Sequence, residues 1–311
     1  MTKVPEIPIS THFFEQRYLF AFATQAEVLH HVRTQSLEEE SARLPEILRA
    51  WEGLRPRVEQ LNERERDIAE SCQLVPVADE HHEAVEAFTK DELFQKTFAG
   101  HAISFAVVEA DKLIAPQRTV HLGYVKRLAE SYPKSPSMRE LLDICVSPKR
   151  MMDPIQHLEV VPNVHVFSSP NSDIRFLGAF VKKLTADDLQ YAVGGGLPAA
   201  AVIAFVGYGV APVNVLLAGR RVVLNNGFHR VYTLRSLGIS RIPVVVQHIR
   251  NVELEFPPAV AGLPKEYLLK VPRPVLIKDF FEPDFSITLK ARERIKMVAV
   301  GISPNQHDVP A

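Results

Sequence analysis

The turn Asn226-Gly227-Phe228-His229-Arg230 constrains the fold of this chain more than any other stretch, because the backbone changes its periodicity there. Before the turn, Val222-Val223-Leu224 is a β-branched, apolar run typical of a strand. After it, apolar residues recur every three positions from Val231 to Leu237, on one face of a helix. Gly238 is suited to end that helix, and Ile242-Pro243-Val244-Val245-Val246 begins another strand. The stretch therefore predicts a strand, a tight turn, a helix and a second strand.

A helix that begins at this turn would direct free backbone N–H groups outward, with roughly +0.5 of an elementary charge at its N-terminus. Gly227 would let an anion approach the backbone, and His229 and Arg230 would add donors in the first turn. Acidic residues usually occupy this end of a helix, so two potential cations there make sense if an external anion completes the site. The alternative is a strand-to-helix turn whose histidine and arginine face solvent or pair with a local carboxylate.

These residues carry a resemblance to the ParB/sulfiredoxin superfamily. Its members have a glycine followed by His-Arg or Arg-Arg, a helix that ends in Leu-Gly, and an (I/V)-P-V strand, as in Gly227–Arg230, Leu237-Gly238 and Ile242–Val244 here. A second stretch, Val108–Arg118 followed by Tyr124–Ser131, is similar to the family's opening strand, its Leu-Ile-x-Pro turn and its first helix. Both stretches occur in the order that the family shows.

The resemblance implies a mixed α/β fold with a ParB/sulfiredoxin-like core, in which the turn at Pro116-Gln117 lies near the His-Arg loop. Arg118 would then reach the same phosphate, whereas the alternative is a surface arginine that pairs with Asp111. The implied ligand is a nucleotide (ATP, ADP or CTP) with Mg²⁺, or another phosphate-bearing small molecule. The residues expected to bind it are Asn226, Gly227, Phe228, His229, Arg230 and Arg118.

The catalytic groups of the better-known relatives have no counterpart at the matching positions. Sulfiredoxins attack their substrate with a cysteine just before the His-Arg pair, where this chain has Phe228. The related serine kinases carry a glutamate base at the Leu-Ile-x-Pro turn, where this chain has Pro116-Gln117-Arg118. Binding of a phosphate ligand is therefore better supported than any reaction, and no catalytic residue is assigned.

Two functions follow from these observations. The first is a cytoplasmic nucleotide-binding protein, with nucleotide hydrolysis or phosphoryl transfer as the activity that its site would serve. The second is a non-enzymatic ParB-like module whose loop is vestigial, or binds a DNA phosphate, while the appended regions contact proteins. An acidic residue beside the phosphates would favour the enzyme, and a basic stripe would favour nucleic acid. That stripe would comprise Arg220, Arg221, Arg235 and Arg241.

We expect a helical region over residues 1–99, the core over 100–250 with an insertion at about 133–198, and an extension with strands over 251–311. Ser36–Glu39 is a capping-box pattern, and Pro56 is expected to kink or divide the helix that follows. An apolar face containing Trp51, Leu54 and Leu61 must pack on the core or form a contact in a homodimer or with another protein.

The insertion and the extension have patterns of their own. Val164–Phe167 and Ile174–Leu184 are expected to be strands, and so are Val275–Ile277 and Ile287–Gly301. Gly194-Gly195-Gly196 is a glycine loop without the Lys-Ser/Thr of a P-loop. Because no helix-turn-helix pattern or basic tract follows Val246, DNA is not the favoured partner.

Composition narrows the class of protein. The chain has 311 residues, 46% of them hydrophobic and 23% charged, with a net charge of −1, so it has no overall attraction for nucleic acid or membrane. Its two cysteines, Cys72 and Cys145, fit a reducing cytoplasm better than a disulfide framework. No apolar stretch reaches the ~18 residues of a membrane span. The polar residues of Asp79–Glu83 are consecutive in the sequence, so their side chains cannot converge on a metal ion from one face of a helix. No metal site is therefore expected.

Overall fold

The computed structural model describes residues 13–147, 154–171, 173–185, 187–188, 198–209, 212–293 and 295–307. The chain divides into two compact units, each built from separate segments. The larger unit comprises Thr11–Arg150 and Val210–Arg292, and the smaller comprises Met1–Ser10, Met151–Gly209 and Glu293–Ala311. This division differs from the expected order of domains, because the N-terminal helices and the central sheet share one unit. Residues 1–12 and the glycine loop at 194–196 lie outside the described residues.

A mixed five-stranded sheet lies at the centre of the larger unit, with strand order β10-β9-β11-β3-β2. β11 runs antiparallel to β3 and parallel to β9, and β10 runs antiparallel to β9. The apolar runs around the turn, Val222–Leu224 and Ile242–Val246, both lie in this sheet, and the combination of helices and strands confirms the mixed α/β class. The strands are β2 (Val75–Pro76), β3 (Ile103–Glu109), β9 (Asn214–Ala218), β10 (Arg221–Asn226) and β11 (Arg241–Ile249).

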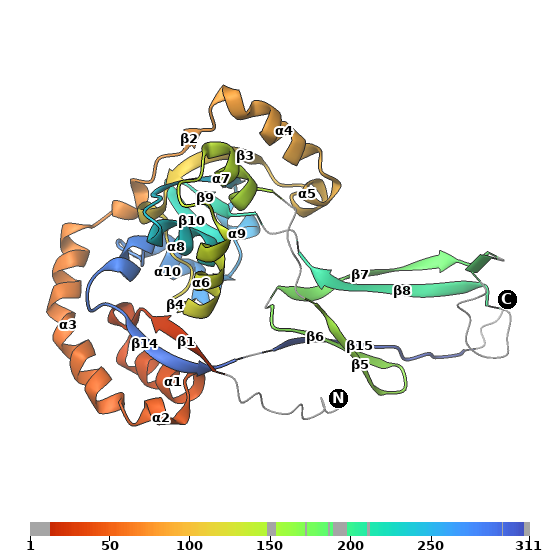
Figure 1. Ribbon diagram of the computed structural model, residues 1–311, viewed down its shortest axis with the longest axis horizontal. Helices are drawn as coiled ribbons and strands as arrows, with labels where there is room; N and C mark the ends of the chain where they lie inside the picture. Colours follow the sequence, from red (N-terminus) through yellow and green to blue (C-terminus); the bar gives the residue numbers. More distant parts are fainter. Residues whose placement is uncertain are drawn as a thin grey trace. The chain divides into compact units, whose positions relative to one another are not determined.

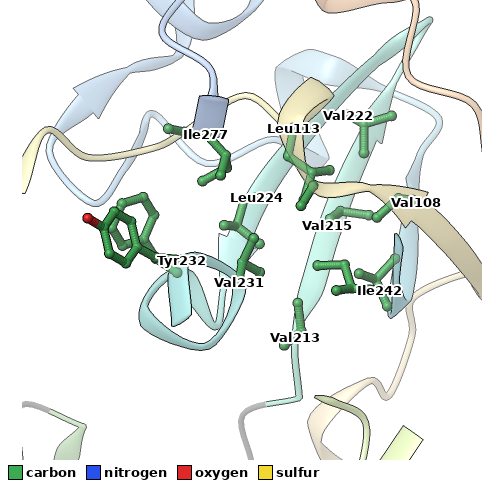
Figure 2. Packing of buried hydrophobic residues seen from close by; sticks show 14 of the residues in the cluster. Val108, Leu113, Val213, Val215, Val222, Leu224, Val231, Tyr232, Ile242 and Ile277 are labelled. Carbon is green, nitrogen blue, oxygen red and sulfur yellow. The ribbon is translucent and has the colours of Figure 1, made fainter. Parts of the chain in front are cut away.

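The core forms where helix α8 (Phe228–Ser236) covers this sheet. Val231 and Leu234 on α8 are fully buried, together with Leu224 on β10 and Val215 on β9. Figure 2 shows Val231 and Tyr232 of α8 beside Leu224, with Val215 of β9, Ile242 of β11 and Val213, which directly precedes β9, in the same cluster. Because α8 begins one residue after β10 ends, this packing fixes the position of the turn.

The other helices of the larger unit include the expected ones. Pro56, which was expected to kink or divide a helix, lies inside the continuous helix α3 (Leu44–Arg64), whose buried apolar side chains Ile47 and Val58 flank it on both sides. Figure 1 shows it as one long helix. The helices are α1 (Gln25–Gln35), α2 (Glu38–Ser41), α3 (Leu44–Arg64), α4 (His82–Lys90), α5 (Glu92–Thr97), α6 (Leu122–Ser131), α7 (Met138–Cys145), α9 (Val252–Glu255) and α10 (Lys265–Lys270). No helix in the described part of the chain is long and apolar enough to cross a membrane.

Two local predictions are wrong. The capping box belongs to Thr24 and Glu27 at the start of α1, whereas Ser36 is the residue at which α1 ends. Val275–Ile277 does not form a strand but makes one bridge, between Leu276 and Ile114, before a 3₁₀ helix begins. Short 3₁₀ helices occur at η1 (Phe20–Phe22), η2 (Ile68–Glu70), η3 (Asp79–His81), η4 (Ala110–Lys112) and η6 (Ile277–Phe281).

A second sheet in the larger unit joins the two ends of its chain. β1 (Phe13–Tyr18) lies between β14 (Ile287–Arg292) and β4 (Thr119–His121), antiparallel to both. A short hairpin of β12 (Ala259–Val260) and β13 (Leu263–Pro264) completes the strands described in this unit. The N-terminal strand is therefore an internal part of the fold rather than an appendage.

The smaller unit contains two antiparallel sheets, with orders β15-β6-β5 and β7-β8. The strands expected at 164–167 and 174–184 are both present, and the apolar tail at 287–301 forms two strands, β14 and β15, in different units. The strands here are β5 (Gln156–Val161), β6 (Val164–Ser169), β7 (Ile174–Lys183), β8 (Ala200–Tyr208) and β15 (Lys296–Gly301).

Candidate phosphate-binding turn

Gly227 is the hinge between β10 and α8, and its φ of 88° places it in the left-handed region that glycine tolerates best. A Cβ atom at this position would lie 2.7 Å from Cγ2 and 3.0 Å from Cα of Val213, and 3.0 Å from Nη2 of Arg230. From the sequence, we expected a glycine here because it would let an anion approach the backbone. In the structure, the space that a side chain would take is occupied by Val213 and Arg230.

Arg230 lies on the first turn of α8 and is buried, with 8% of its surface exposed. Its Nη1 donates to the carbonyl oxygens of Ile144 and Cys145, each at 3.2 Å. These are the last residues of α7, where carbonyl groups lack partners within the helix. Cys145 O also accepts a hydrogen bond from the backbone N–H of Val213 at 2.6 Å. The guanidinium therefore ties the end of α7 to the start of α8.

His229 is partly buried and accepts a hydrogen bond at Nε2 from the backbone N–H of His121, at 3.2 Å. Tyr124 of α6 lies edge-on to its ring, with centroids 5.3 Å apart. Burial, with a smaller effect of the neighbouring His121, lowers the pKa of His229 to about 4. At neutral pH the ring is thus uncharged, and its Nε2 is an acceptor rather than a donor for an anion.

The remaining members of the turn differ in their surroundings. Phe228 is buried against Phe280, with ring centroids 5.4 Å apart, so this member of the turn belongs to the core. Asn226 pairs with Asn214 at a bulge in the β9–β10 ladder. The exposed neighbour Asn225 donates to Asn214 Oδ1 at 3.1 Å.

Arg118 does not follow either expectation. Its Nη1 donates to Glu27 of α1 at 2.7 Å, and its guanidinium lies over the ring of Tyr267 at 5.6 Å. Burial would lower the pKa of Arg118, but the hydrogen bond to Glu27 and the interaction with Tyr267 raise it. Asp111, the expected partner, instead forms an ion pair with Arg235 at 2.5 Å. Arg118 therefore contacts α1 and α10, whereas His229 contacts β4 and Arg230 contacts α7.

The groups that sequence reasoning missed are backbone groups and small apolar residues. The carbonyl oxygens of α7, the N–H of His121 and the side chain of Val213 all contact the turn from distant positions in the chain. One signal was available: α7 has no glycine at its C-terminal end, so its last carbonyls need an outside donor.

The electrostatic surroundings of the turn contain few ionised groups. No acidic residue lies in the first turn of α8. Among the described residues, no group of three or more His, Cys, Asp or Glu side chains is arranged to hold a metal ion. Cys72 and Cys145 are both buried thiols, and burial raises the pKa of Cys72 to about 11. The site therefore offers hydrogen-bonding backbone and one buried cation that already has partners.

Comparisons with known proteins do not extend this description. No model of a protein family, no curated protein and no solved structure matches the chain. The ParB/sulfiredoxin resemblance accordingly stays a prediction, while the mixed α/β fold stands on the structure itself.

Proposed function

We propose that this protein is a non-enzymatic interaction module in which the Asn226–Arg230 turn stabilises the larger unit. The observation that carries the proposal is the use of Arg230, whose Nη1 binds the two terminal carbonyls of α7. An anion at the turn would have to compete with these contacts and with the close packing of Gly227 on Val213. Burial of the uncharged His229 ring supports the same reading.

The basic residues around the turn argue against nucleic acid as the partner. Arg221 is buried and donates to the carbonyl oxygens of Leu268 and Val271 at 3.1 and 2.8 Å. Arg220 lies 3.7 Å from Glu70, and Arg235 pairs with Asp111. Three of the four arginines that would form a basic stripe thus have partners within the fold.

A phosphate ligand is the second candidate, and one observation favours it. The first turn of α8 has no acidic side chain to complement the helix dipole, and exposed Asn225 borders it. Under this reading the turn binds a nucleotide, with Mg²⁺ bridging its phosphates. The side chain of Arg230 would leave the carbonyls of α7 when the ligand binds.

Isothermal titration of the full chain with ATP, ADP and CTP, each with and without Mg²⁺, separates the two candidates. If the protein is a non-enzymatic interaction module, we expect no saturable nucleotide binding below millimolar concentrations. Binding in the micromolar range would overturn it if Asn225→Ala, which leaves the buried contacts of Arg230 in place, weakened that binding severalfold. Arg241→Ala, at an exposed position in β11 beyond the far end of α8, is the matched control and should change nothing.

A further inference from the structure

The hairpin of β7 and β8 keeps large apolar side chains exposed on both of its faces. Phe180 and Phe205 stack on one face with ring centroids 5.6 Å apart, and Val181 and Val202 form a directly opposed pair on the other. Figure 1 shows the two strands as a long ribbon. The exposed large apolar residues of the hairpin are Phe176, Leu177, Phe180, Val181, Val202 and Phe205. Because a two-stranded hairpin is marginally stable at best in water, this surface needs a partner.

The two outer edges of the hairpin differ. β7 carries Arg175, Lys182 and Lys183, and its pairing is interrupted by a bulge between Phe176 and Gly178. Charges and bulges of this kind protect an edge strand from pairing with another chain. β8 has the sequence AAVIAFVGY, without a charge, a proline or a bulge of its own. Among the described strands β8 pairs only with β7, so its other edge is open.

The sequence of β8 is complementary to itself. If a second copy runs antiparallel with Ile203 opposite Ile203, then Val202 lies opposite Ala204. In the same register Ala201 lies opposite Phe205, and Ala200 opposite Val206. Val202, Phe205 and Val206 thus each meet an alanine, and Ile203 meets its own copy, so no two aromatic or charged side chains oppose each other. A two-fold contact of this type needs one surface only, because each copy presents the same one.

The strand with the open edge carries large exposed side chains on both faces. Val202 is 67% exposed on one face, and Phe205 is 48% exposed on the other. Pairing with a second β8 would give each of them a cross-strand neighbour from the other copy, whereas the side chains of β7 stay outside the contact.

We propose that this protein forms a homodimer through β8, in which the two hairpins make a four-stranded sheet of order β7-β8-β8′-β7′ centred on Ile203. The sheet continues the apolar rows of both hairpins across the two-fold axis. The inference rests on the proposed interaction role and names its partner as a second copy of the chain. Its evidence, however, lies in the smaller unit and not at the turn.

Sedimentation velocity over micromolar to hundreds of micromolar protein tests the dimer. Ala204 and Ala179 are a matched pair, since they lie directly opposite each other and both are exposed. Ala204→Lys places a charge on the open strand and should weaken the dimer at least about tenfold in Kd. Ala179→Lys, on β7, should leave the Kd within about twofold. A wild type that is monomeric throughout, or equal effects of the two lysines, would overturn the proposal.

Disulfide trapping tests the register without changing the charge. Ile203→Cys should cross-link two copies under mild oxidation, because the two sulfurs meet at the axis. Val181→Cys is the control, because β7 is separated from the axis by β8, and it should remain uncross-linked. Cross-linking of both, or of neither, contradicts the register. A monomer that binds no nucleotide refutes the dimer alone, whereas nucleotide binding at the turn refutes the interaction role alone.

Discussion

At Gly227, backbone conformation and packing can be separated by experiment. Gly227→Ala should lower the free energy of unfolding by about 2–4 kcal/mol, because a Cβ costs about 1–2 kcal/mol at this φ and also overlaps Val213. Gly238 is the matched control, since its φ is 86° but a Cβ would meet nothing within 4 Å. Gly238→Ala should cost only about 1–2 kcal/mol in the same urea titration. Equal losses of unfolding free energy in the two variants would show that Val213 moves aside without destabilising the protein.

Arg230 should behave as a structural residue. Arg230→Ala removes the guanidinium donor of the Ile144 carbonyl, while the Cys145 carbonyl keeps its bond from the N–H of Val213. A buried carbonyl without a donor costs about 1–3 kcal/mol, and the loss of the buried side chain's packing adds to this. We expect the free energy of unfolding to fall by about 2–4 kcal/mol, while exposed Arg241→Ala changes it by less than about 0.5 kcal/mol. Chemical denaturation of the three proteins measures this. Unchanged stability of Arg230→Ala would mean that water replaces the guanidinium.

His229 should make stability depend on pH. Its folded pKa of about 4 lies below the ordinary 6.5, so the unfolded chain binds a proton first as the pH falls. The stabilisation is complete above pH 6.5 and is lost progressively between about pH 6.5 and 4, by an amount of order 1–3 kcal/mol. His229→Gln should flatten this part of the curve of unfolding free energy against pH. If the slope of unfolding free energy against pH were the same in His229→Gln, other titrating groups would be responsible for the pH dependence.

The sequence predicted the backbone of the turn but not its partners. Strand, glycine and helix follow from local periodicity, which Val222–Leu224 and Val231–Leu237 carry themselves. The contacts of Arg230 and Gly227 come from Cys145 and Val213, whose approach depends on the whole fold. Arg118 shows the same limit, because its partner Glu27 lies on a helix ninety-one positions earlier in the chain.

At the scale of elements, a buried ion network joins α3 to the segment after α10. Arg273 is almost fully buried and donates from Nη2 to Asp279 at 2.6 Å and to Glu65 at 2.9 Å. Asp279 also accepts from the backbone N–H of Leu276 at 2.7 Å. The aspartate thus satisfies both a buried cation and the start of η6. Removing one partner of such a pair leaves a buried charge uncompensated.

Asp279→Ala should therefore lower the free energy of unfolding by about 3–5 kcal/mol. Asp284→Ala is the control, because Asp284 lies exposed and 3.9 Å from Arg57, and it should cost about 0–1 kcal/mol. Thermal and urea unfolding of both variants give the comparison. A loss below 1 kcal/mol for Asp279→Ala would indicate that Glu65 alone compensates Arg273.

Periodicity predicted most helices and strands, and the failures have a common cause. Val275–Ile277 has the composition of a strand, but Asp279 turns the chain into η6 immediately afterwards. Ser36 has the spacing of a capping box, but it ends α1 and forms a bridge with Ala291, and Leu37 is the N-cap of α2. In both cases contacts with other segments override a local pattern.

At the scale of the whole molecule, the N-terminal region is inseparable from the core of the larger unit. β1 is the middle strand of its sheet, and Leu19, Phe88 and Phe94 are buried in the same cluster as α8. Deleting residues 1–98 should therefore abolish cooperative unfolding and leave an aggregating chain. Circular dichroism during heating, with light scattering, measures both. A soluble fragment with a sharp transition would contradict the shared core.

The division into two units could not be predicted from the sequence, because each unit is built from segments that are far apart in the chain. Composition and turn signals place boundaries along the sequence, at 99 and 250 here, but β1 pairs with β14 across nearly the full length. Such pairing depends on distant partners that no local window contains.

Because both units are discontinuous in sequence, some strands are synthesised long before the strands with which they pair. β6 is the middle strand of the sheet β15-β6-β5, and its partner β15 is separated from it by more than a hundred residues. At about 5–20 residues per second, a ribosome needs roughly 6–25 s to make that interval. During this time one edge of β6 is without its final neighbour on the nascent chain, and one edge of β1 in the larger unit waits still longer for β14. In both units, therefore, a strand edge stays open until the end of synthesis, when translation speed and chaperone occupancy matter most.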